Sequence, residues 1–294
     1  MEFRTASHRF QASFYPRILS GSRALLIRMG IVALASIPLH ADAEIILGTA
    51  GRFAVLGGST VTNTGSSVIA GGNVGVSPGT SITGFPPGTV AAPYTFHAGD
   101  AEALQAQTDL TSAYNTAAGR SPTGVLTGQD LGGLTLSPGV YVFASSAQLT
   151  GTLTLDNLGD PLAEFVFQIG STLTTASNSS VVTINGGVMP GSTVFWQVGS
   201  SATLGTNTVF EGHILALTSI TLTNGATILN GSALARNGAV TLDTNTIINA
   251  VPEPATLTLA LLGAALLGVP AFARRCRARR ACGGGGIASE PDRE

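Results

Sequence analysis

The segment FVFQIGSTL, residues 165–173, recurs with variations through the second half of the chain. The related segments are YVFASSAQL at 141–149, FWQVGSSATL at 195–204, HILALTSITL at 213–222 and ALARNGAVTL at 233–242. Each holds a short alternating apolar run, a corner of small residues and a second run that ends in Leu. A third run follows in the later copies, at 207–210, 226–229 and 245–248. Three short strands per repeat, separated by Gly, Ser and Asn, predict a mainly β fold, a β-solenoid with three faces.

Looser repeats precede this region, and one helix separates the two. Residues 45–92 contain strand-length runs divided by glycines, and prolines close that block. The period then changes to 3.6, and a helix is predicted at about 100–118, with Asp100 as N-cap and Gly119 at its end. Its apolar face comprises Ala103, Ala106, Leu110, Tyr114 and Ala117. We expect it to pack along a solenoid flank, such as the one where Phe195 and Gln197 point outward.

The composition excludes several kinds of protein. The chain of 294 residues has only 10% charged residues and no lysine. Residues 44–250 hold three arginines against ten acidic residues, a formal charge of 3 − 10 = −7. Such a surface offers no basic patch for phosphates, so nucleic-acid binding is not expected. Both cysteines, Cys276 and Cys282, lie outside this region, so it has neither a disulfide framework nor a cysteine metal site.

The two ends of the chain are interpreted as targeting segments. Residues 1–43 have arginines, an apolar stretch and the small-residue site Ala41-Asp42-Ala43, the order of an export signal peptide. Residues 255–273 are almost wholly apolar and predict a transmembrane segment, which the arginine-rich stretch 274–280 would hold on the cytoplasmic side. The tail 281–294, with four consecutive glycines, is predicted to be disordered.

Residues 251–280 resemble the PEP-CTERM sorting signal of Gram-negative bacteria. The motif Pro252-Glu253-Pro254 precedes the apolar span and the arginine cluster, in the order that this signal requires. The resemblance implies transient anchoring in the inner membrane, cleavage by an exosortase, and release to the cell surface or the extracellular matrix. The fourteen residues after the cluster depart from the usual pattern, which ends soon after it.

The middle of the chain, 44–250, resembles the bacterial and fungal ice-binding protein family. The resemblance rests on LGTAGRFAVLGG at 47–58, GQDL at 128–131, LSPGVY at 136–141, FVFQIG at 165–170 and VFWQVG at 194–199. It implies a right-handed β-solenoid of triangular cross-section with one long flanking helix. It also implies that the N-terminal coils are not adjacent in space to their sequence neighbours.

An ice-binding surface should be a flat, rigid face with rows of hydroxyl and methyl groups, and threonine carries both on a stiff side chain. The first candidate row lies on the outward side of the strands that end in Thr-Leu. It comprises Thr152, Thr154, Thr172, Thr174, Thr203, Thr221, Thr223 and Thr241. Gly205 and Asp243 interrupt this row. The second takes the third run of the repeats: Thr208, Thr227 and Thr246. Threonine is also common in any exposed strand, so such rows suit an ordinary solenoid as well.

Catalysis is not expected, and no cofactor or metal is predicted. The acidic residues of the middle region are dispersed, with no short motif among them: Asp130, Asp156, Asp160, Glu164, Glu211 and Asp243. Neither His97 nor His213 has a partner at metal-ligand or triad spacing, and we expect His213 to be a surface or corner residue.

The sequence therefore predicts an exported, non-catalytic ice-binding solenoid whose partners are the ice surface and, during export, an exosortase. The alternative is a matrix or adhesion protein in which the same solenoid is a rigid spacer, associated with extracellular polysaccharide. The flatness of the threonine face separates the two, since a sugar binder would need a groove or an aromatic shelf.

Overall fold

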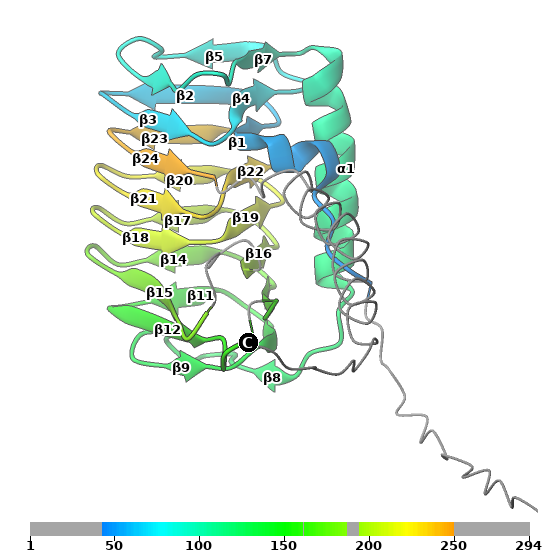
Figure 1. Cartoon of the computed structure of the whole chain (residues 1–294), viewed down its shortest axis with the longest axis vertical. Coiled ribbons are helices and arrows are strands. Elements are labelled where there is room, and N and C mark those ends of the chain that lie inside the picture. The colour runs from blue at the N-terminus through cyan, green and yellow to red at the C-terminus, as the bar shows by residue number, and fades with distance from the viewer. Residues whose placement is uncertain (1–42, 161, 187–193, 250–294) are drawn as a thin grey trace, which may run out of the picture. The chain divides into compact units, whose positions relative to one another are not determined.

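The computed structural model describes residues 43–160, 162–186 and 194–249, and all of its strand pairs are parallel. The strands form three sheets that run along a solenoid, and each complete coil contributes one strand to each sheet (Figure 1). The predicted β-solenoid with a flanking helix is confirmed. The predicted signal peptide, the span at 255–273, Pro252-Glu253-Pro254 and the tail lie outside the described residues. Within them, no helix is long and apolar enough to cross a membrane.

We call the nine-stranded sheet, which lies beside the helix, sheet A. A 3-10 helix, Gly48–Arg52, leads into its strand β1. In spatial order its strands are β7 (Phe96–Ala98), β4 (Asn73–Val76), β1 (Phe53–Gly57), β22 (Ala233–Ala235), β19 (His213–Ala216), β16 (Val194–Val198), β13 (Phe165–Ile169), β10 (Gly139–Phe143) and β8 (Gly124–Val125).

Sheets B and C form the other two sides of each coil. Sheet B contains β11 (Ala147–Leu149), β14 (Leu173–Thr175), β17 (Ala202–Leu204), β20 (Ile220–Leu222), β23 (Val240–Asp243), β2 (Thr60–Thr64) and β5 (Ser81–Thr83). Sheet C contains β6 (Thr89–Val90), β3 (Val68–Ala70), β24 (Thr246–Ile248), β21 (Thr227–Leu229), β18 (Val209–Glu211), β15 (Ser180–Ile184), β12 (Thr152–Asp156) and β9 (Thr135–Leu136).

The stacking order is discontinuous in sequence. The N-terminal coils pair with the last coil, since β1 pairs with β22, β2 with β23 and β3 with β24. Helix α1 (Ala101–Ala118) then runs along the solenoid, from the end that holds β7 to the end that holds β8 (Figure 1). The discontinuity that the family resemblance implies is therefore present.

The interior of the solenoid is filled by the inward side of all three sheets. Its centre is an aromatic stack, in which the rings of Phe167 and Trp196 lie 3.9 Å apart at 8° and Phe210 lies 4.8 Å from Trp196. Phe167 and Trp196 lie opposite each other on the paired strands β13 and β16, and Phe210 comes from β18 of sheet C. The buried indole Nε1 of Trp196 donates to the Glu211 carbonyl oxygen at 3.0 Å, so its polar atom is satisfied.

Helix α1 covers the outward side of sheet A. Leu110 and Tyr114 pack with Phe195, Leu215 and Leu234 in a second apolar cluster, as expected for the helix face and for Phe195. The helix begins at Asp100, whose carboxylate accepts from the backbone N–H of Ala103 at 2.9 Å. Polar contacts add to the apolar ones, because side-chain amides donate across the interface. Gln107 Nε2 donates to the carbonyl oxygens of Gly57 and Ala235, and Gln168 Nε2 to those of Ala117 and Arg120. Sheet A is therefore an internal surface.

Candidate functional site

The outward side of sheet B carries a continuous row of threonines. Strand register places Thr174 beside Thr203, Thr203 beside Thr221, and Thr221 beside Thr241. The row continues onto the N-terminal coils, where Thr241 pairs with Thr62 and Thr62 with Thr83. We call these six side chains, one from each of six adjacent strands, the threonine row: Thr174, Thr203, Thr221, Thr241, Thr62 and Thr83.

Alternation along each strand turns these side chains outward. In β20, Ile220 and Leu222 are buried in the core on either side of Thr221, and Val240 and Leu242 flank Thr241 in the same way. Successive residues of a strand point to opposite faces, so burial of the two neighbours leaves the threonine on the surface. Its branched Cβ restricts χ1, so the row is stiff as well as regular.

The hydroxyls of the threonine row have no hydrogen-bond partner among the residues that the structure describes. Other threonines behave differently. Thr172 Oγ1 donates to Ser146 Oγ at 2.8 Å, and Thr223 Oγ1 donates to the Leu204 carbonyl oxygen at 2.8 Å. The row thus presents hydroxyls that the fold does not use, each beside a methyl group.

Two further rows of small side chains border the threonine row. Thr172 precedes strand β14 on one side, level with Ser201 and Ser219 in the neighbouring coils. Thr223 lies on the other side, next to Gly205, because Leu204 pairs with Leu222. Gly205 and Asp243 therefore belong to this bordering row. They interrupt the row of Thr223, as the sequence predicts, but they leave the central row continuous.

The structure separates the remaining candidates from this face. Thr152 and Thr154 lie in β12 of sheet C, where they pair with Ser180 and Val182, so grouping them with the Thr-Leu strands is wrong. The corner at Thr150-Gly151 is so short that the chain has already turned onto the next face.

The second candidate row is only partly correct. Thr227 and Thr246 are neighbours on the outward side of sheet C. Thr208 is fully buried, and its hydroxyl bonds to Thr175 Oγ1 at 2.8 Å and donates to the Ala176 carbonyl oxygen. Val209, and not Thr208, pairs with Thr227. A slip of one residue reverses the face, which is why Thr208 was misplaced.

Sequence reasoning missed Thr62 and Thr83, which complete the row. The alternation in Thr60-Val61-Thr62 and Ser81-Ile82-Thr83 marks both as outward residues of strands. Their place beside Thr241 depends on the register between β2 and β23, and no local pattern reports that register.

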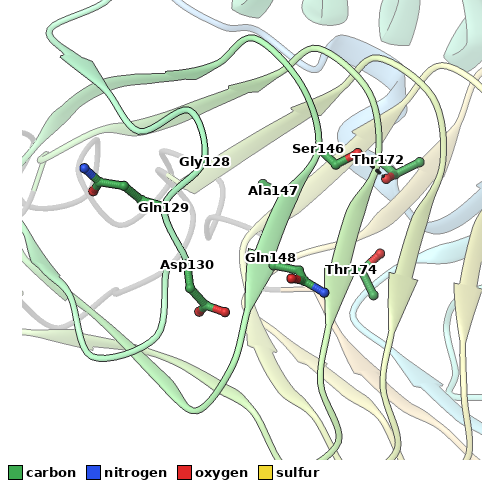
Figure 2. A pocket seen from close by; sticks show the side chains of 8 residues that line it. All are labelled: Gly128, Gln129, Asp130, Ser146, Ala147, Gln148, Thr172 and Thr174. Atoms are coloured by element: carbon green, nitrogen blue, oxygen red, sulfur yellow. Dashed lines mark hydrogen bonds between the residues drawn. The ribbon is translucent and has the colours of Figure 1, made fainter.

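One end of the row meets a hollow of about 360 Å³. Figure 2 shows Gln148, which takes the position next to Thr174, and Asp130 on the loop that faces it. Asp130 Oδ1 accepts from the backbone N–H groups of Gly132 at 2.7 Å and Thr150 at 2.9 Å. Burial raises the pKa of Asp130, but these hydrogen bonds outweigh it, so its pKa lies below the usual value. Asp130 is thus a charged residue that holds the loop, and the row ends at Gln148.

The two histidines of the solenoid have structural partners. His213 is buried, contrary to the expectation of a surface position. Its ring stacks on Phe195 at 5.6 Å, and its Nδ1 lies 2.8 Å from Ser232 Oγ. Burial lowers the pKa of His213 to about 4, so the ring is neutral at pH 7. His97 Nδ1 lies 2.8 Å from Asp100 at the helix start, a partner that sequence spacing did not suggest.

The acidic residues do not converge on a site. Asp156 accepts hydrogen bonds from the backbone N–H of Leu158 and from the side chain of Asn185. Both bonds lower the pKa of Asp156, and the bond from Leu158 has the larger effect. Asp160 accepts from the backbone N–H of Leu162 in the same turn. No group of three His, Cys, Asp or Glu residues gathers to hold a metal ion within the described part of the chain.

Comparison with known proteins agrees with this geometry. A family model described as ice-binding-like matches residues 55–248. The chain belongs to this family. A protein named ice-binding protein from Nostoc sp. (strain HG1) is 58% identical over 275 residues, which cover 90% of this chain and 99% of that protein. The resemblance drawn from the sequence is confirmed.

Solved structures of family members share the fold. The crystal structure of an ice binding protein from an Antarctic biological consortium superposes with a TM-score of 0.66 at 50% sequence identity. The matched region covers 70% of this chain and 91% of that protein. The ice-binding protein of the Antarctic ascomycete Antarctomyces psychrotrophicus has 41% identity and a TM-score of 0.66. The matched region covers 70% of this chain and 98% of that protein. The region that this chain shares with the Antarctomyces protein is therefore almost the whole of that structure.

The end of the chain matches a second model, the PEP-CTERM protein-sorting motif, at residues 250–280. The chain thus carries the sorting signal that its Pro-Glu-Pro sequence, apolar segment and arginine cluster indicate.

Proposed function

We propose that this protein binds ice through the threonine row of sheet B. The observation that carries the proposal is the row itself. Six neighbouring strands each present one threonine in register, and within the described residues none of the six hydroxyls is bonded to the protein. The names of its family relatives, which are called ice-binding proteins, support the same function.

The physical reason lies in spacing and stiffness. Neighbouring strands of a sheet lie about 4.7–4.9 Å apart, and side chains on one face repeat along a strand at about 6.4–6.8 Å, twice the rise per residue. These distances approximate repeats of oxygen positions on ice. Rigid methyl groups leave room for ordered water between them, and the free hydroxyls bond to that water without first breaking a bond within the protein.

The other two faces are less suited to this role. Sheet A is covered by helix α1 through Leu110 and Tyr114. On sheet C, valines and larger aliphatic side chains alternate with threonine. The outward positions of sheet B's described strands carry no aromatic side chain, so this face lacks the shelf that a sugar-binding matrix protein would use.

The test uses residues 44–250, the segment that corresponds to nearly the whole of the Antarctomyces structure. Thermal hysteresis and inhibition of ice recrystallisation are measured for the original sequence, for Thr221→Tyr and for Ser112→Tyr. Thr221 is central in the row, so a bulky ring there should hold the face away from ice and abolish activity. Ser112 is exposed on helix α1, and a tyrosine there should change nothing.

Two results would contradict the proposal. A folded protein that leaves ice growth unchanged would favour the matrix or adhesion role instead. Full activity of a folded Thr221→Tyr variant would remove the threonine row from the site.

We further propose that the sorting signal delivers the solenoid outside the cell. In this scheme residues 255–273 hold the precursor in the inner membrane until an exosortase cuts at Pro252-Glu253-Pro254. The matched motif at 250–280 supports this route. In a host with an exosortase, the full chain should be released as a shortened form, and replacement of the three motif residues by alanine should leave it in the membrane fraction. Equal release of both forms would contradict the route.

A further inference from the structure

We propose that the membrane-anchored precursor holds its threonine row toward the solution, so that a membrane carrying the uncleaved chain adheres to ice. The inference rests on the proposed function and concerns the same row in a second state of the protein, before release. It begins from the place where the sorting signal joins the solenoid. Asn249, the last described residue before that signal, occupies the corner that leads from sheet C to sheet A.

The stacking order of the coils fixes this junction. In the preceding coil Asn230 holds the equivalent corner, because Leu229 pairs with Ile248, and the chain continues from there into β22. After Asn249 the place beside β22 in sheet A is already taken by β1. The C-terminal chain cannot add a strand there, so the corner at Asn249 is the point from which the sorting signal extends.

Asn249 is tied firmly into the fold. It is only 3% exposed, its backbone N–H donates to the Ala70 carbonyl oxygen at 2.9 Å, and its Nδ2 donates to the Gly51 carbonyl oxygen at 3.0 Å. Gly71 permits this packing, since a Cβ at that position would overlap the Asn249 carbonyl oxygen. An anchor that follows Asn249 therefore pulls on a buried corner of the solenoid.

This corner lies opposite the threonine row. Each coil passes through sheet A, sheet B and sheet C in that order, as β19, β20 and β21 do. In a coil of three sides, the corner between C and A faces sheet B across the core. Thr241 is the member of the row in the coil that ends at Asn249, and it lies between Thr221 and Thr62. The anchor is therefore attached behind an interior position of the row.

The connection to the membrane is too short to turn the row toward the bilayer. Six residues lead from Asn249 to Ala255, the first of the apolar span (255 − 249 = 6). Fully extended they cover at most about 22 Å, and part of that length must cross the headgroup layer. The chain itself takes eight residues from Thr241 to Asn249 along the side of sheet C (249 − 241 = 8). A tether on the same route would end before it passed the row.

Anchoring should also strengthen the contact with ice. Copies in one membrane carry their rows on the side away from that membrane, so the first contact brings neighbouring rows close to the same ice surface. Linked binding sites gain from this high effective concentration without any new contact. The anchored chain is thus a link between a membrane and ice, and cleavage by an exosortase would free the solenoid without being needed for its activity.

The first experiment measures adhesion with the full chain, produced in a host that lacks an exosortase. Sealed right-side-out vesicles of the inner membrane are placed in slowly growing ice, and the fraction taken into the ice is measured. Vesicles with the original chain and with Ser112→Tyr should be enriched in ice several-fold over vesicles with Thr221→Tyr. Equal exclusion of all three, although residues 44–250 show thermal hysteresis, would overturn this inference and leave the proposed function intact.

The second experiment measures orientation without ice. Single cysteines are introduced as Thr203→Cys in the row and as Arg52→Cys beside the corner, with Cys276 and Cys282 replaced by serine. A bulky, membrane-impermeant maleimide should label Thr203→Cys at the same rate in the vesicles and in residues 44–250. Arg52→Cys should react several times more slowly in the vesicles, because the membrane shields that corner.

The remaining outcomes assign a failure to its source. Slow labelling of Thr203→Cys in the vesicles, with unchanged labelling of Arg52→Cys, would show the row against the membrane and refute the inference. Absence of the full chain from the membrane fraction would remove the anchor and the inference with it. Absence of hysteresis in residues 44–250 would instead contradict the proposed function, and the labelling rates would still report how the solenoid is oriented.

Discussion

Sheets A and B are built from the same coils and differ only in what they show to the outside. In one coil Phe195 points outward from sheet A and is 5% exposed, whereas Thr203 points outward from sheet B and has no hydrogen-bond partner in the described chain. The large apolar side chains of sheet A bind the helix, and the short β-branched ones of sheet B leave that face bare. The comparison teaches that the solenoid provides spacing and stiffness on every face, and outward side chains decide its use.

The largest effect should come from the covered face. Phe195→Ala removes a ring that packs between sheet A and helix α1, and such truncations lower the free energy of unfolding by roughly 3–5 kcal/mol. Denaturant unfolding measures the change. Ice activity per folded molecule should stay the same, and a specific loss of activity without loss of stability would contradict the division of roles between the faces.

The second effect is a dependence of stability on pH that originates on sheet A. The folded pKa of His213 is about 4, below the ordinary 6.5, so the unfolded chain binds more protons between these values. Stability should therefore be complete above about pH 6.5 and fall by about 3 kcal/mol as pH drops to 4. Unfolding curves across this range provide the measurement.

His213→Gln is the matched variant for that titration, since it keeps a polar side chain near Ser232 but does not ionise. Its stability should be flat over the same window. Folding lowers the pKa of carboxyls such as Asp100 and Asp156 below their ordinary value of 3.8. Their titration therefore changes the stability only at lower pH. An equal slope in both proteins would refute the assignment to His213.

A smaller effect is expected at the start of the helix. Asp100→Ala removes the carboxylate that accepts from the Ala103 N–H, and the loss of such a cap lowers stability by about 1 kcal/mol. Asn115→Ala, at an exposed position of the same helix, should not destabilise the protein. Thermal unfolding of the two variants tests whether helix α1 contributes to stability through this cap.

The smallest effect on stability belongs to the bare face. Thr203→Ala should change the free energy of unfolding by less than about 0.5 kcal/mol, because its side chain bonds to nothing in the described protein. Thermal hysteresis should nevertheless fall, since the variant interrupts the threonine row between Thr174 and Thr221. Thr83→Ala, at the end of the row, should reduce hysteresis less. The reverse ranking would place the centre of the ice contact on the N-terminal coils.

Local patterns predicted much of this molecule. Period-2 alternation identifies the repeated strands of the second half of the chain, and the helix predicted at about 100–118 spans Ala101–Ala118. The inward position of Trp196 and the outward position of Phe195 also followed from alternation. These features depend on neighbours a few residues apart, which is the range that sequence periodicity reports.

The candidate site was less predictable, and its errors have a common cause. The repeats align Thr208 with Thr227 in sequence, but Val209 is the partner of Thr227 in the sheet, and a slip of one residue turns a buried side chain outward. The repeats also place Thr152 on the face of Thr172, which is wrong because the corner after Leu149 is shorter than the corners of later coils. Irregular corners therefore shift the alignment of the repeats, even where the strands themselves are recognised.

By itself, the sequence determined which side of each strand faces the core, where the helix begins and ends, and which family the chain resembles. Tertiary structure alone decided that Thr62 and Thr83 extend the row of Thr241, since β2 pairs with β23 across about 180 residues of chain. Inward and outward positions are encoded by alternation within a strand, a local property. The order in which coils stack depends on the pairing of the N-terminal coils with the last coil, and that is a property of the whole fold.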